Sequence, residues 1–274
     1  MNDPVDRTAP VPDHAAPVPG LVTLHVWRVP RRRLPRVLAR MAVDAGRLRR
    51  VDGVRFAKLL GTGTGTGFGP TDVDPTRWAA LVVWDDPATA AGFDTSPVGR
   101  SWRRIADTRV RVDLRPLHSR GRWSGVAPFG EPGGQPGGQP GGGQPGAGRP
   151  VLALTRARLR PAKAVTFWRA VPPVAAALAD ADGLHCRFGV GEAPLGWQGT
   201  VSVWRDTADL TRFAYRHPQH RAAITRTPVT QWYAEELFAR FEVLGVTGDR
   251  AVLGWAGEGW AGKDEDGTCG AGGG

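Results

Sequence analysis

Cysteine is almost absent from this chain of 274 residues, which contains only Cys186 and Cys269. Secreted domains that depend on disulfides carry many more cysteines at regular spacings. Cys186 falls within an expected strand and Cys269 close to the last residue, so the two do not form a disulfide framework. This scarcity predicts a protein of the reducing cytoplasm.

Long apolar runs are missing as well. No segment approaches the roughly 20 residues that a transmembrane helix needs. The first residues lack the basic start and the apolar core of a signal peptide. We therefore predict a soluble cytoplasmic protein, and leave open a peripheral contact with a membrane.

Acidic residues are outnumbered, and the formal net charge is +10. Nearly all of the cations are arginine, in a chain that is also rich in Ala, Gly and Pro, so a composition bias of the genome explains the excess. No zinc-finger spacing and no aromatic RNA-binding strand accompanies the charge. We predict no nucleic-acid partner, whereas acidic redox proteins and anionic lipid headgroups remain suited to such a surface.

An internal repeat is the main positive feature of the sequence. Residues 21–29 match residues 151–159 as strands, at an offset of 130 positions. The offset falls to 120 where residues 83–86 match residues 203–206, so the first copy has ten additional residues in one loop. The chain therefore contains two copies of one structural unit.

Each copy is expected to form strand, helix, strand, strand, helix and strand in that order. Apolar residues at helical spacing behind Pro35 predict the first helix. Asp85 or Asp86 is suited to cap a second helix that begins at Pro87 and turns Phe93 inward. The expected strands of the first copy cover residues 21–29, 54–60, 78–84 and 110–114.

This βαββαβ order is that of the ferredoxin-like unit, whose helices lie on one face of an antiparallel sheet. Two such units in one chain can cover each other's open sheet faces. We therefore predict an α+β fold, in which duplicated ferredoxin-like repeats pack as a pseudo-dimeric α/β barrel that can hold a ligand. The expected segments are a disordered tail (1–20), the first repeat (21–129), a Gly/Pro/Gln linker (130–150), the second repeat (151–246) and a flexible tail (247–274).

The segment GTGTGTGF (61–68) places glycine at every second position. This alternation fits neither the dinucleotide fingerprint nor the phosphate loop, which also requires a lysine. Two interpretations remain. The segment is either a flexible connection between two strands or a place where bare backbone, at Gly63 and Gly65, approaches a ligand.

The segment GRWSGVAPF (121–129) is dense in aromatic residues and glycine although it directly precedes the linker. Trp123 and Phe129 either plug one end of the barrel as ordinary apolar contacts or form a wall of a ligand cavity.

Histidine is scarce, and two of the six histidines, His217 and His220, follow the second helix of the second copy. Pro218 between them suggests a new turn, on which His220 shares a face with Ile224. A histidine in such a position is either structural or a metal ligand. Zinc is the weaker metal hypothesis, because no cysteine or acid pair completes a four-ligand set.

Several segments together resemble the spheroidene monooxygenase family of carotenoid biosynthesis. They are GTGTGTGF, GRWSGVAPF, LTRARLRP with FWRAVP, VSVWRDTADLTRFAYRHPQHRAAI, and WYAEELFARFEVLG, and they extend from about residue 21 to residue 245. GRWSG followed by PF is the most specific of them.

The resemblance implies oxygenation of an acyclic carotenoid by dioxygen, with haem iron as the cofactor and a reduced ferredoxin as the electron donor. Haem suits such chemistry because amino-acid side chains supply no oxidant strong enough for an unactivated C–H bond. The resemblance makes His220 the expected haem ligand, with His217 in reserve. Arg122 and Trp123 are the candidate catalytic residues, and Phe129, Gly63 and Gly65 are expected at the substrate.

Two other functions remain open from the residues themselves. A cofactor-free barrel oxygenase would use the substrate to activate oxygen. A barrel without enzymatic activity would bind a tetrapyrrole or a lipid as a carrier or sensor.

Overall fold

The computed structural model describes residues 18–65, 72–130, 148–163, 166, 178, 181–192, 197–216 and 232–255. The first repeat forms β1 (Leu21–Arg28), η1 (Arg31–Arg33), α1 (Leu34–Leu48), β2 (Val54–Gly63), β3 (Val73–Trp84), η3 (Pro87–Thr95), α2 (Pro97–Ile105) and β4 (Thr108–Gly121). The second forms β5 (Val151–Leu159), η4 (Pro161–Lys163), β6 (Leu184–Gly191), β7 (Trp197–Trp204), α4 (Thr207–Arg216), β8 (Tyr233–Gly248) and η5 (Arg250–Leu253).

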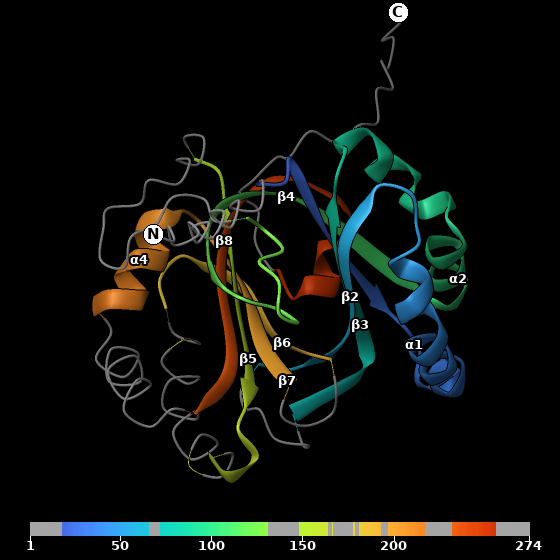
Figure 1. Ribbon diagram of the computed structural model, residues 1–274, viewed down its shortest axis with the longest axis horizontal. Helices are drawn as coiled ribbons and strands as arrows, with labels where there is room; N and C mark the ends of the chain where they lie inside the picture. Colours follow the sequence, from blue (N-terminus) through green and yellow to red (C-terminus); the bar gives the residue numbers. More distant parts are fainter. Residues whose placement is uncertain are drawn as a thin grey trace, which may run out of the picture.

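Within the described residues, eight strands close into one antiparallel barrel in the order β1-β3-β2-β6-β7-β5-β8-β4 (Figure 1). Each repeat contributes four adjacent strands in the same order, β4-β1-β3-β2 and β8-β5-β7-β6. Equivalent strands pair where the repeats meet, β2 with β6 and β4 with β8. The expected α+β class, with eight antiparallel strands and few helices, is thus confirmed.

The barrel interior is a continuous apolar core. Alternate residues of each strand point to the same face of a sheet. On β1 these are Val22, Leu24 and Val26, each at most 1% exposed, and β5 contributes Leu152 and Leu154 to the same cluster. The alternation that predicted the strands therefore also determines which residues line the interior.

Helices α1 and α2 lie side by side on the outer face of the first repeat's sheet (Figure 1). Asp86 caps a helical segment as expected, accepting a hydrogen bond from the backbone N–H of Ala88 (2.9 Å). That segment is the 3₁₀ turn η3, however, and the α-helix begins ten residues later, at Pro97. Because proline disfavours helical backbone at the residue before it, Ser96 is extended and caps α2 instead.

No helix in the described ranges combines the length and the apolar character needed to cross a bilayer.

Residues 247–255, where a flexible tail was expected to start, have a defined structure. Strand β8 continues to Gly248, and Asp249 caps η5 by accepting from the N–H of Ala251 (2.9 Å). Val252, Leu253 and Trp255 are at most 5% exposed and belong to the barrel core. Their burial explains why residues 249–255 are structured, although this segment has no apolar periodicity.

His25 on β1 is expected to make folding sensitive to acid. Its imidazole is 4% exposed and stacks on Phe93 at 3.8 Å between ring centroids. Burial, with smaller contributions from Arg111 and Arg109, holds the pKa of His25 well below its ordinary value. The unfolded chain therefore binds a proton that the folded chain does not, and the free energy of unfolding falls as the pH drops below about 6.5.

This one group should contribute up to about 1.4 kcal/mol per pH unit. Urea unfolding between pH 7.5 and pH 5, on the wild type and on His25→Phe, measures the effect, since phenylalanine keeps the stacking and removes the proton site. The slope in the acidic range should be smaller in the variant. Equal slopes would show that His25 does not titrate on unfolding.

Candidate functional site

The GRWSG segment folds as a tight turn at the end of β4. Gly121 has a φ of 87°, and a Cβ at this position would overlap the carbonyl oxygen of Glu236 on β8. The N–H of Arg122 donates to that same carbonyl (2.8 Å). The N–H of Trp123 then donates to the carbonyl of Val126 (2.8 Å), which reverses the chain. The requirement for glycine at position 121 follows from this close approach.

Trp123 and Phe129 enter the apolar core of the barrel. They are 1% and 0% exposed, and both belong to the interior cluster. Trp123 meets the edge of Phe56 at 5.6 Å and Phe129 meets Phe241 at 4.9 Å between ring centroids. Both side chains therefore fill the interior between the repeats.

Arg122 lies outside this core. Its side chain is exposed, and its guanidinium donates to the carbonyl of Gly125 (3.1 Å) within the same turn. Of the two candidate catalytic residues, the structure thus brings Trp123 into the interior and leaves Arg122 at the surface.

A cluster of charged side chains surrounds Trp123. Arg156 on β5, 2% exposed, alternates with the core residues of its strand. One arm of its guanidinium donates to Glu192 (3.0 Å) and the other to Glu235. The arginine therefore bridges two carboxylates at the inner side of the barrel, in the paired geometry that buried charges require.

Lys58 on β2 completes the cluster. Its ammonium donates to Glu192 (2.6 Å) and to the hydroxyl of Ser124 (2.6 Å). The indole N–H of Trp123 donates to the same Glu192 carboxylate (2.6 Å). The charges of Lys58, Arg156, Glu192 and Glu235 balance, and the cluster fixes the orientation of the Trp123 ring.

Glu235 on β8 holds the GRWSG turn in place. Its carboxylate accepts from the backbone N–H groups of Gly125 (2.8 Å) and Ser124 (3.2 Å). Burial alone would raise the pKa of Glu235, but the hydrogen bonds from Gly125, Arg156 and Ser124 outweigh it and lower the pKa. The carboxylate is therefore ionised at neutral pH, and it ties the first repeat to the second.

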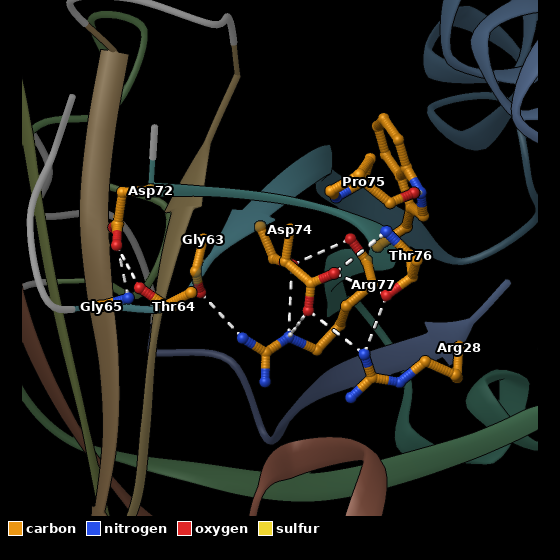
Figure 2. A network of polar contacts seen from close by, with 11 residues as sticks. Arg28, Gly63, Thr64, Gly65, Asp72, Asp74, Pro75, Thr76 and Arg77 are labelled. Carbon is orange, nitrogen blue, oxygen red and sulfur yellow. Dashed lines mark hydrogen bonds and ion pairs between the residues drawn. The ribbon is translucent and has the colours of Figure 1, made fainter. Parts of the chain in front are cut away.

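Gly63 and Gly65 lie at the seam where β2 meets β6 (Figure 2). Gly65 has a φ of 78°, and a Cβ there would lie 3.1 Å from the Cα of Phe188. Its N–H is 3.3 Å from the carboxylate of Asp72, and the carbonyl of Gly63 accepts from Arg77 (2.8 Å). The backbone groups proposed to meet a ligand thus have partners within the protein.

Arg77 is a buried cation at the centre of a second group of polar contacts, which it makes with Thr62, Gly63 and Asp74 (Figure 2). Its Nε lies 3.2 Å from the hydroxyl of Thr62 and 3.6 Å from the carboxylate of Asp74. Burial lowers the pKa of Arg77, although Asp74 opposes the shift. Cys186 lies in the nearby core, and burial raises the pKa of its thiol to about 12, so it is protonated at neutral pH.

The outer faces of the two sheets differ in side-chain size at matched positions. Trp27 of β1 corresponds to Ala157 of β5, and Leu59 of β2 corresponds to Gly189 of β6, both at the offset of 130. In the first repeat Trp27 stacks on Trp102 of α2 at 4.8 Å. The second sheet therefore has small residues where the first sheet has large apolar ones.

A polar row crosses this outer face of the second sheet. The strand register places His118, Arg240, Ala153, Ser202 and Arg187 next to one another, on β4, β8, β5, β7 and β6. Two arginines thus flank two small residues. The Nδ1 atom of His118, at one end of the row, is buried and has no hydrogen-bond partner within the described structure.

The three histidines in the described ranges are His25, His118 and His185. Burial is the largest cause that lowers the pKa of each. His217 and His220, the two expected haem ligands, lie outside the described residues. In the ranges that are described, no group of three His, Cys, Asp or Glu side chains is arranged to hold a metal ion.

The described residues define an α+β protein whose eight antiparallel strands close into a barrel. A crystal structure of an aldoxime dehydratase has a similar fold, with a TM-score of 0.50 and 16% sequence identity over 86% of this chain and 88% of that one. At this identity the likeness concerns the fold alone. No family model matches the sequence.

Two relatives identify the family. The spheroidene monooxygenase of Rhodobacter capsulatus is 35% identical over 232 residues, which cover 84% of this chain and 88% of the relative. The spheroidene monooxygenase of Cereibacter sphaeroides is 33% identical over 235 residues, covering 85% of this chain and 66% of the relative. The chain belongs to the spheroidene monooxygenase family, as the sequence motifs predicted.

Proposed function

We propose that the protein is a monooxygenase that oxygenates an acyclic carotenoid or a similar isoprenoid with dioxygen. The observation that carries the proposal is the similarity to the two spheroidene monooxygenases over more than four fifths of the chain. The proposed electron donor is a reduced ferredoxin or a protein of the same type.

The proposal includes haem as the cofactor, which would supply the activation of dioxygen that side chains cannot. His220 is the proposed ligand, and His217 is held in reserve. An imidazole is a usual axial ligand of haem iron.

The outer face of the second sheet fits such a group. Ala157 and Gly189 are small residues at the positions where the first sheet carries Trp27 and Leu59. Arg187 and Arg240 supply cations for the carboxylates of a tetrapyrrole, and planar guanidinium groups suit that role. The unpaired Nδ1 of His118 fits a polar ligand on the same face.

We also propose that the barrel is a pseudo-dimer, in which each repeat takes the place of one subunit. The pairing of equivalent strands at both joins supports this interpretation. It explains why the outer face of the first sheet can keep packed tryptophans, such as Trp27, while the matched position on the second sheet carries Ala157.

The direct test combines a spectrum with an isotope experiment. The purified protein is titrated with haem and then given an acyclic carotenoid, a reductant and isotopically labelled dioxygen. Labelled oxygen in the product and a Soret band on the protein would support the proposal. Turnover without haem would identify a cofactor-free oxygenase, and a Soret band without turnover would identify a binding protein.

A second test fills the outer face of the second sheet. Ala157→Trp introduces the residue found at the matched position of the first sheet, and should lower haem affinity at least about tenfold, the effect of roughly 1.4 kcal/mol of overpacking. Ala157→Ser is the matched control and should bind haem normally. Full binding by a folded Ala157→Trp variant would show that haem does not use this face.

A further inference from the structure

Helix α1 has an unusual exposed face. Its inner side packs on the sheet through Leu34, Val37, Met41 and Leu48. On its outer side, Leu38 is 56% exposed and Val43 is 48% exposed. Pro35, Ala39, Ala42 and Ala45 are also exposed. The outer side of a surface helix normally carries charged and polar residues instead.

The charges around this face are almost all positive. Residues 31–50 contain eight arginines and a single acid, Asp44. The Asp44 carboxylate is buried and pairs with Arg40 and Arg47, so it does not offset the remaining arginines at the surface. Arg31, Arg32, Arg36, Arg49 and Arg50 are exposed.

The neighbouring helix extends the positive surface. α2 contains Arg100, Arg103 and Arg104, all of them exposed, and no acid. Both helices lie on the side of the barrel that faces away from the second repeat (Figure 1). Exposed aliphatic side chains and a broad cationic surface therefore occur together on one layer of the molecule.

We propose that the outer face of α1 docks on the surface of an anionic phospholipid bilayer. Leu38 and Val43 would enter the headgroup region, while the surrounding arginines bind lipid phosphates and extend their chains toward the interface. Charge complementarity is the basis for choosing this occupant. A second copy of the chain is disfavoured, because the same cationic face would repel itself.

An acidic protein would also satisfy the arginines, but a bilayer suits the exposed aliphatic residues as well. In this respect alone the choice rests on the proposed function, since a long polyene dissolves in a bilayer and not in water. Docking by α1 would place the enzyme at the phase that contains its substrate.

Vesicle cosedimentation tests the docking without any need for activity. The full-length protein is mixed with vesicles of phosphatidylcholine alone or of phosphatidylcholine with phosphatidylglycerol, at low and high salt. We expect binding to the anionic vesicles only, and its loss at high salt. Binding to neither kind of vesicle would overturn the proposal.

Two variants separate the contributions. Leu38→Asn with Val43→Asn removes the aliphatic contacts, and Arg36→Gln with Arg49→Gln removes charge. Each should weaken binding to anionic vesicles by at least about tenfold, given the area and charge removed. Val73→Asn, at an equally exposed valine of β3, is the matched control and should bind like the wild type.

The thermal unfolding of each variant establishes that it is folded. Unchanged vesicle binding by both folded double variants would overturn the proposal. If they lost turnover with a soluble protein donor but kept vesicle binding, the face would instead dock an acidic protein. A failure of carotenoid oxygenation alone, with vesicle binding intact, would contradict the proposed function and not the docking.

Discussion

Replacing His220 by alanine should abolish the haem absorption band while the barrel stays folded. In the proposed complex, the bond from His220 to the iron would be the strongest single contact between the protein and haem. Its loss would leave only packing and charge contacts. Even residues that merely orient a metal ligand change affinity by about 10- to 100-fold. Removal of the ligand itself should therefore have at least that effect.

The measurement is a haem titration followed by absorbance in the Soret region, with circular dichroism to establish folding. His217→Ala is the matched control, because that histidine lies three positions away and should at most weaken binding. Full occupancy and an unchanged ligand-field spectrum in His220→Ala would contradict the assignment. Loss of haem in His217→Ala instead would transfer the role to that residue.

The sequence predicted the framework of the fold because two signals agree in it. Period-two alternation on β1 and β5 identifies strands, and the offset between the copies shows that both must have the same topology. Neither signal determines the residue at which a strand or helix ends. β4 continues to Gly121, well beyond the expected residue 114, because its second half pairs with β8 of the other repeat.

Long-range packing also explains why residues 249–255 are structured. Val252, Leu253 and Trp255 are buried because they pack against core residues of the barrel strands, and no local periodicity can report that. Their apolar character was visible in the sequence, but their partner surface was not. Trp255, for example, stacks on His185 of β6 at 5.0 Å.

The candidate site was only partly predictable. The dense aromatic composition of GRWSGVAPF pointed to Trp123 and Phe129, and both are in the core. The charged residues around them were missed, although a signal existed. Lys58 and Arg156 occupy inward positions of alternating strands, and a charge at such a position requires partners that only the folded barrel can supply.

The first repeat expressed alone, as residues 21–129, should aggregate or remain partly unfolded. In the intact barrel its two edge strands, β2 and β4, pair with β6 and β8. Separation would leave both edges without partners, and unpaired edges promote association. It would also expose the inward residues of all four strands, including Leu24, Leu81 and Leu114, which are at most 3% exposed in the barrel.

Each fully buried aliphatic side chain of this kind contributes about 1.5–3 kcal/mol. Several of them together are therefore comparable to the 5–15 kcal/mol that stabilises a typical domain. Size-exclusion chromatography and urea unfolding of the fragment test the expectation, and a monomer with a cooperative transition would count against the shared core.

Two changes to the intact chain provide the control. Cleavage near Gly142, or deletion of residues 133–146, should leave the fold, the stability and the activity nearly unchanged, since a segment of Gly, Pro and Gln buries too little apolar surface to contribute. If the deletion removed activity from a folded protein, the linker would have a function beyond joining the repeats. If both the fragment and the cleaved protein fold, the repeats are independent domains, and the charged cluster around Trp123 joins two units that are already stable.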